Sequence, residues 1–290
     1  MIKISPMWAT PILARVPGRK SCATLLAAMA SLLWMPVSAS AQGDLLVAPT
    51  RIVMNGGGSA EVVLNNIGAT PATYRISLEL RRMLADGSLE PIDQADYTPE
   101  QNAMLEMVRY APRRIQLPPN QPQSVRISAR PPEGFGDGEY RVHMTFRAVP
   151  EAPAVEAPRD PAAASGFTLK LTPIYGVTIP VIVRKGQLAG EASILGAALV
   201  RDGNEPAIRI DLARTGNRSV YGELRIVAPG AKQPAFLVRG IAIYPELAQR
   251  SLQMGLTPAQ VAALKGPMVV EYREMPEQGG RLMASRPVTF

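Results

Sequence analysis

The 290-residue sequence contains one cysteine, Cys22, and one histidine, His143. A single cysteine excludes an intramolecular disulfide, so stability has to come from apolar burial. A zinc site with the usual histidine and cysteine ligands is not expected either. Walker-type phosphate loops and the Gly-x-Ser-x-Gly nucleophile motif are absent. These absences argue against most cofactor-dependent and nucleophilic enzymes, and we predict no cofactor and no metal.

Strong charge of one sign is also lacking once the N-terminal segment is set aside. Residues 1–41 carry four basic residues and no acidic ones, which leaves 27 basic against 24 acidic residues in the remainder, a net charge of +3. Nucleic-acid binding usually needs a clustered basic face, so we do not expect a nucleic-acid partner.

The N-terminal segment has the three parts of a secretory signal peptide. Arg15, Arg19 and Lys20 precede a largely apolar stretch over residues 22–37, and Ala39-Ser40-Ala41 supplies small residues for cleavage. A membrane anchor is the alternative, but a spanning helix needs roughly 20 apolar residues. We therefore predict cleavage after Ala41 and export to the periplasm without a membrane anchor.

The rest of the chain alternates apolar and polar residues with a period of two, which indicates half-buried β-strands. Residues 73–80 show this pattern clearly, and Asp86-Gly87 is a hairpin turn pair. The glycines at 56–58 predict a turn between residues 50–54 and a partner strand at 60–66. Thr98 and Gln101 have the spacing of a capping box, so a short helix is expected over residues 98–107.

Many short strands separated by turns favour β-sandwiches, and the length favours two of them. Glycines at 186 and 190 mark the boundary. We expect an all-β protein with one immunoglobulin-like domain over residues 42–185 and a second over residues 186–290. A short helix at 257–264 interrupts the second domain.

Residues 167–184 form the most informative segment, because the predicted strand is much longer than the usual five or six residues. It follows a loop over 149–166 that is rich in proline, alanine and glutamate and shows no periodicity. Proline cannot donate a ladder hydrogen bond and is confined to edges and bends. Because Pro173 and Pro180 lie within this segment, we predict an edge strand. Its odd-numbered face carries apolar side chains, among them Leu169, Leu171 and Tyr175.

Side chains with catalytic potential are few. His143 lies on the polar face of its strand beside Arg141 and Thr145, and we expect it to face solvent. Carboxylates are scattered through the first domain, and a glycosidase-like pair among them stays an alternative because the sequence does not give their separation.

Three passages resemble, in order, the PapD-like periplasmic chaperones of the chaperone–usher pathway. The first passage, residues 49–53 (PTRIV) and 62–66 (VVLNN), resembles the family's arginine strand and its apolar strand that ends in asparagine. The second resembles the family's best-conserved stretch of the first domain and comprises residues 112–117 (PRRIQL), 123–127 (QSVRI), 139–140 (EY) and 146–150 (FRAVP). The third, residues 179–184 (IPVIVR), resembles the strand that leads to the hinge. The likeness is weaker beyond residue 190, as in a divergent member.

The resemblance implies two immunoglobulin-like domains in a boomerang arrangement and a chaperone that delivers pilus or fimbrial subunits to an outer-membrane usher. In the family, the chaperone lends its long strand to a subunit that lacks its final strand, which is β-strand addition. Leu169, Leu171 and Tyr175 match the side chains that fill the subunit groove. Free chaperones of the family also self-associate through this edge.

The family anchors the subunit's terminal carboxylate with an arginine and a lysine. Arg51 matches the arginine, and a guanidinium suits a carboxylate because it donates two parallel hydrogen bonds. The lysine is not matched: its place falls at or near Pro180, and Lys170 and Lys185 are out of register. Either another cation acts with Arg51, or the two-point anchor is absent.

Glu139 and Arg184 match a pair that bridges the two domains in the family, and we expect them to orient the hinge. The alternative function is a secreted immunoglobulin-like module with a structural or adhesive role. Such a module would need no lent strand and no carboxylate anchor.

Overall fold

The structure is a computed structural model, and it describes residues 45–150 and 174–290. The chain divides into two units, residues 1–41 and residues 42–290, and every described element belongs to the second. The predicted signal peptide lies outside the described residues, as do residues 151–173 of the predicted loop and long strand.

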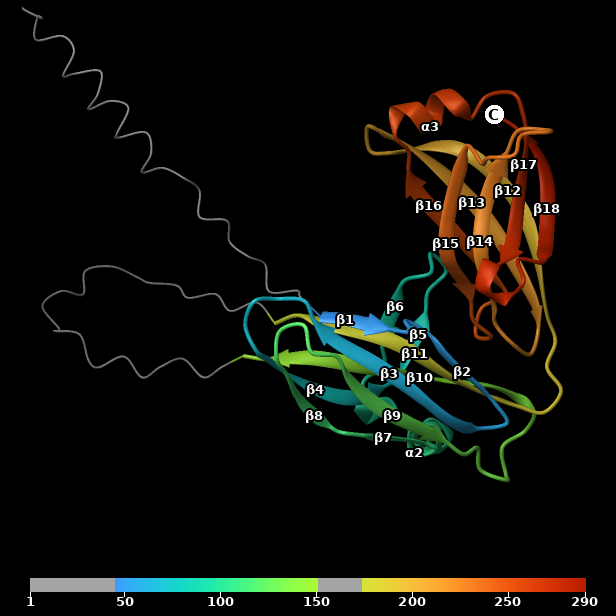
Figure 1. Cartoon of the computed structure of the whole chain (residues 1–290). Coiled ribbons are helices and arrows are strands. Elements are labelled where there is room, and N and C mark those ends of the chain that lie inside the picture. Colours follow the sequence, from blue (N-terminus) through green and yellow to red (C-terminus); the bar gives the residue numbers. More distant parts are fainter. Residues whose placement is uncertain (1–44, 151–173) are drawn as a thin grey trace, which may run out of the picture. The chain divides into compact units, whose positions relative to one another are not determined.

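Residues 45–150 and 174–185 form the first β-sandwich (Figure 1). Its four-stranded sheet has the order β1 (Leu45–Ala48), β3 (Gly58–Asn66), β9 (Gln123–Ala129), β7 (Val108–Ala111). Its five-stranded sheet has the order β2 (Ile52–Asn55), β11 (Gly176–Lys185), β10 (Gly138–Val149), β4 (Ala72–Glu79), β8 (Arg114–Leu117). These orders correspond to the A-B-E-D and G-F-C arrangements of immunoglobulin domains. All strand pairs are antiparallel except the parallel pair β2–β11.

Residues 190–290 form a second sandwich from seven strands. One sheet has the order β12 (Gly190–Asp202), β13 (Glu205–Gly216), β16 (Gln249–Gly255). The other has the order β15 (Phe236–Ile243), β14 (Val220–Val227), β17 (Pro267–Glu274), β18 (Leu282–Thr289). This is again an immunoglobulin-like order, with the fourth strand placed beside the third rather than beside the fifth. The prediction of two immunoglobulin-like sandwiches is confirmed.

A few elements lie outside the four sheets. They are the hairpin β5 (Arg81–Met83) and β6 (Leu89–Pro91), the 3-10 turns Gln94–Asp96 and Pro276–Gln278, and the helices α2 (Pro99–Glu106) and α3 (Pro258–Ala263). Capping boxes start both helices, from Thr98 and Gln101 in α2 and from Thr257 and Gln260 in α3. Within the described part of the chain, no helix has the length and hydropathy that a membrane crossing requires.

The predicted pairing of residues 50–54 with the strand at 60–66 is wrong. The three glycines at 56–58 do turn the chain with positive φ, as predicted. However, β2 and β3 lie in different sheets: β2 pairs with β11, whereas β3 pairs with β1 and β9. The glycine turn therefore carries the chain from one sheet to the other, an outcome that local turn chemistry cannot distinguish from a hairpin.

Each sandwich has its own apolar core. The first is centred on fully buried side chains that include Leu64, Leu117 and Phe146, and the second on Ile210, Leu224 and Tyr272. A smaller cluster joins Met83 of the hairpin and Ile182 of β11 to Ala242 and Tyr244 of the second sandwich. This small cluster lies next to the candidate site described below.

The strand β11 is paired unequally along its length. Over residues 176–185 it pairs with β10, but β2 joins its other side only over residues 181–184. The prediction of an edge strand is therefore wrong for residues 181–184, because sequence periodicity did not reveal the short parallel strand β2. Residues 176–180 pair with β10 alone among the described residues.

Candidate functional site

Arg51 directly precedes β2, and the register of the sheet fixes its neighbour. Ile52 pairs with Val181 in the parallel pair β2–β11, so Arg51 lies beside Pro180, one step earlier in both strands. Pro180 in turn pairs with His143 of β10. Arg51, Pro180 and His143 thus form a row across the outer face of the five-stranded sheet. Pro180 occupies the middle position, at or near which the family resemblance predicts a lysine.

Residues of the second sandwich hold the Arg51 guanidinium. Its Nη1 donates to the Tyr244 hydroxyl at 3.1 Å, and its Nη2 donates to Ser219 Oγ at 3.1 Å. The guanidinium carbon lies 4.4 Å from the centre of the Tyr221 ring, within the range of a cation–π contact. These contacts orient Arg51 while each Nη keeps one hydrogen for a further acceptor.

Glu139 and Arg184 form a further row of the same face, two rows away from His143 and Pro180, because they are paired residues of β10 and β11. Arg184 Nε donates to Glu139 Oε2 at 2.9 Å, and Ser219 Oγ donates to the same oxygen at 2.9 Å. Ser219 therefore links Arg51 to Glu139 in one chain of hydrogen bonds. The Glu139 side chain is fully buried, and its Oε1 has no partner among the described residues.

Arg141 lies between these two rows and is a residue that sequence reasoning did not assign. Its side chain is 8% exposed, donates to Glu246 and to the Arg81 carbonyl, and stacks 3.6 Å from the centre of the Tyr244 ring. Met83 N also donates to Glu246, at 3.0 Å. An apolar–polar alternation places Arg141 on the outer face of β10 but carries no signal that another part of the chain covers it.

The prediction that His143 faces solvent is wrong. His143 is 1% exposed, and neither ring nitrogen has a hydrogen-bond partner among the described residues. Burial lowers the pKa of His143 to about 3, and the positive charges of Arg141, Arg81 and Arg51 add to this effect. The imidazole is neutral at ordinary pH and has no acid or base partner in the described structure.

A cavity of about 300 Å³ opens beside Arg51. Three arginines line it, and among the described residues its only acidic lining residue is Glu274, which accepts hydrogen bonds from Arg281. The full lining is Arg51, Val53, Asn55, Arg184, Gly190, Arg218, Ser219, Val220, Tyr221, Glu274, Gln278 and Met283. Such a lining suits a small anion, and a carboxylate in particular.

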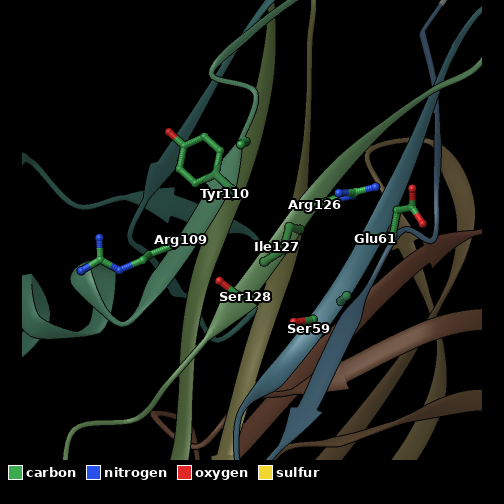
Figure 2. Close-up of a pocket in the computed structure, with 9 residues that line it drawn as sticks. Ser59, Glu61, Arg109, Tyr110, Arg126, Ile127 and Ser128 are labelled. Carbon is green, nitrogen blue, oxygen red and sulfur yellow. The ribbon is translucent and has the colours of Figure 1, made fainter.

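A larger concavity, of about 670 Å³, lies on the outer face of the four-stranded sheet (Figure 2). Figure 2 shows Arg126 and Glu61 on neighbouring strands, with Arg109 and Tyr110 on the far side of Ile127. Its charged residues Glu61, Arg109 and Arg126 are exposed, and none of its buried polar side-chain atoms lacks a partner. We take the Arg51 cavity as the candidate site, since it combines partly buried cations with donors that lack partners.

The predicted donor-strand residues are only partly described. Leu169 and Leu171 lie outside the described residues. Tyr175 immediately precedes β11, its side chain is 38% exposed, and its carbonyl accepts a hydrogen bond from Ala148 N at 2.9 Å. Ile174 beside it is 58% exposed. The chain thus approaches the part of β11 that has β10 on one side and no described strand on the other with two exposed apolar side chains.

Metal binding has no support in the described residues, where no group of three or more His, Cys, Asp or Glu side chains is placed to hold an ion. The signal that identifies the site is instead the sheet register, which brings Arg51, Arg184 and Glu139 to one face. Sequence reasoning named these three residues but missed Arg141, Ser219, Tyr221 and Tyr244, because only folding brings residues 219–246 to this face.

Neither a protein-family model nor a curated protein matches the sequence. Among solved structures, the chain is similar to the CupB2 chaperone of Pseudomonas aeruginosa, with 14% identity, 84% of this chain and 100% of that chain covered, and a TM-score of 0.44. It is also similar to the YadV chaperone (14% identity, 85% and 100% covered, TM-score 0.43).

A third similar structure is a complex of the SafB chaperone with the SafA pilin from Salmonella enterica (17% identity, 85% and 96% covered, TM-score 0.41). The immunoglobulin-like fold described above follows from the strand order of this chain itself.

Proposed function

We propose that this protein is a periplasmic chaperone that binds pilus or fimbrial subunits by lending them a β-strand and delivers them to an outer-membrane usher. The observation that carries the proposal is the unequal pairing of β11. Residues 176–180 have β10 on one side and no described strand on the other. An unpaired row of backbone donors and acceptors is a template for strand addition from another chain.

The side chains that precede this edge support the same function. Ile174 and Tyr175 are exposed apolar residues, and in the sequence Leu171 and Leu169 continue the odd-numbered apolar pattern of Tyr175. In strand addition, backbone hydrogen bonds supply general affinity, and alternate side chains enter pockets of the partner. Full burial of each such side chain contributes roughly 1.5–3 kcal/mol by transfer estimates.

Arg51 supports the proposal through its position at the end of the unpaired edge. It lies beside Pro180, where the open part of β11 stops and β2 begins. A subunit strand that pairs along residues 176–180 therefore has its end close to the Arg51 guanidinium. A terminal carboxylate there would accept charge-assisted hydrogen bonds, which are about twice as strong as neutral ones.

The test is co-expression of the full chain with the small secreted proteins encoded beside it, followed by affinity purification and mass spectrometry. We expect a stoichiometric partner that is unstable when produced alone. Tyr175→Glu should abolish its capture, because a charge would enter the partner's apolar groove. Leu237→Glu is the matched control, since Leu237 of β15 is 39% exposed and lies on a different sandwich.

Two outcomes would contradict the proposal. Capture that survives Tyr175→Glu together with charged substitutions at Leu169 and Leu171 would show that the strand is not lent. A chain that is purified alone while those secreted proteins are present would favour a structural or adhesive module. If this chain without a subunit is a dimer that Tyr175→Glu dissociates, a second copy of the chain occupies the edge of β11.

A further inference from the structure

We propose that Arg218 of the second sandwich is the second cation of the anchor, and that it binds the subunit's terminal carboxylate together with Arg51. This inference rests on the proposed function for the identity of the ligand. It assigns the role of the missing lysine to a residue that lies outside the first domain, in the turn between β13 and β14. The reasons are the charges that line the cavity, the unused donors among them and the fixed position of this turn.

The cavity beside Arg51 has an excess of positive charge. Arg51, Arg184 and Arg218 line it, and Glu274 is the only acidic residue of the lining in the part of the chain that the structure describes. Glu274 accepts hydrogen bonds from Arg281 at 2.8 and 3.2 Å, so its charge is already compensated. Arg184 is paired with Glu139, so the guanidinium groups of Arg51 and Arg218 beside a space of about 300 Å³ are left without a matching carboxylate among the described residues.

Arg218 has the largest unused donor capacity of the three. Its guanidinium makes no hydrogen bond to any described residue, and its Nε is buried without a partner. Arg184 uses Nε for Glu139, and both Nη groups of Arg51 already hold one acceptor each. A buried donor without a partner is costly, so binding of an acceptor to the Arg218 guanidinium would be favoured.

The turn that carries Arg218 is held from both sides. Buried Arg214 donates to the carbonyls of Gly216 and Arg218 at 2.7 and 3.2 Å. Asn217 accepts from Ala189 N at 2.9 Å and donates to the Gln187 carbonyl at 3.1 Å, which ties the turn to the segment that follows β11. Arg218 is therefore presented to the cavity by a fixed backbone, which lowers the entropic cost of binding.

The other candidate cations are already committed. Arg141 is not part of the cavity lining and is bound to Glu246 and the Arg81 carbonyl. Lys185 donates to three carbonyls, those of Pro132, Glu133 and Phe135, at 2.6–3.0 Å, which uses all three of its protons. Lys170 lies outside the described residues. Among the described cations near Arg51, Arg218 has the best combination of access and free donors.

The experiment uses N-acetylleucine as a minimal chain terminus and N-acetylleucinamide as its neutral counterpart. Binding to the exported protein is followed by NMR of the arginine Nε–Hε groups, with signals assigned from the variants. We expect N-acetylleucine to shift the Arg51 and Arg218 signals and N-acetylleucinamide to leave both unchanged. Arg218→Ala should weaken N-acetylleucine binding at least tenfold, and Arg218→Lys should restore part of the loss.

Arg239→Ala is the control, because Arg239 is exposed on β15 and pairs with Glu223 away from the cavity. Equal binding of the acid and the amide, or undiminished acid binding by folded Arg218→Ala, would overturn the assignment. The absence of N-acetylleucine binding by the unmodified protein would do the same. If the proposed function alone is wrong, the result is different: N-acetylleucine would still bind in an Arg218-dependent way, but co-expression would capture no subunit.

Discussion

The two faces of β10 are both buried, but by different means. The inner face carries Val142, Met144 and Phe146, each no more than 2% exposed in the first apolar core. The outer face carries Arg141, His143 and Thr145, which are nearly as inaccessible. Thr145 Oγ1 and Thr178 Oγ1 are 2.9 Å apart, and Arg141 is bound to Glu246.

This difference shows that alternation assigns a residue to a face but does not say whether that face meets water. Apolar packing covers the inner face, and its energy depends on volume and area. Residues of the hairpin and of the second sandwich cover the outer face, and they also compensate its charges. His143 is the exception, since both of its nitrogens lack described partners. The two faces should therefore respond differently to substitution.

The largest effect is expected on the inner face. Phe146→Ala removes a fully buried ring from the first core, and such substitutions cost about 3–5 kcal/mol. Urea unfolding followed by circular dichroism measures the change. Leu46→Ala, which shortens an exposed side chain, is the control and should stay close to the unsubstituted protein. A loss below about 1 kcal/mol for Phe146→Ala would contradict the described core.

The next effect tests the compensated charge of the outer face. Arg141→Ala leaves Glu246 without its cation and uncovers the Tyr244 ring. Loss of one partner of a fully buried pair costs roughly 3–5 kcal/mol, and we expect about 2–3 kcal/mol because Glu246 is 35% exposed. Unfolding of Arg141→Ala, Glu246→Ala and the double variant separates the pair from its surroundings. Arg147→Ala, on the same strand but exposed, is the matched control.

A pH titration sharpens the comparison at the uncompensated residue. The folded state lowers the pKa of His143 from 6.5 to about 3, so the unfolded chain binds the proton more readily. The contribution of His143 to the free energy of unfolding should therefore be fully present above pH 6.5 and be lost as the pH decreases toward 3. The expected loss from His143 is roughly 1.4 kcal/mol per pH unit in that window.

The control for this titration is His143→Leu, which removes the group that titrates. This variant should flatten the pH dependence between pH 6 and 4.5 and should not be less stable at pH 7.5, because two unsatisfied buried nitrogens disappear. An unchanged slope would assign the pH dependence to other groups.

The smallest effect is expected for an ion pair that water already surrounds. Arg82 and Glu90 of the hairpin are 3.2 Å apart, with 66% and 47% of their side chains exposed. Exposed pairs contribute about 0–1 kcal/mol, so Arg82→Ala should unfold within about 0.5 kcal/mol of the unsubstituted protein. A larger loss in urea would mean that the hairpin is held by charge rather than by the burial of Met83.

The sequence by itself determined the class of fold, because short-range rules govern it. Period-two alternation identified the strands, Thr98 with Gln101 identified α2, and Asp86-Gly87 identified the hairpin turn. Arg51, Glu139 and Arg184 were found through a family resemblance rather than through chemistry. They became one cluster only when sheet register placed them on one face.

Tertiary structure decided everything that depends on which segments meet. Local patterns could not show that β2 pairs in parallel with β11, and this pairing leaves residues 176–180 as the open part of β11 in the described structure. They also could not show that His143 is buried or that Ser219, Tyr221 and Tyr244 surround Arg51. The physical reason is that alternation reports the direction of a side chain, whereas burial and charge compensation depend on residues that are distant in the sequence.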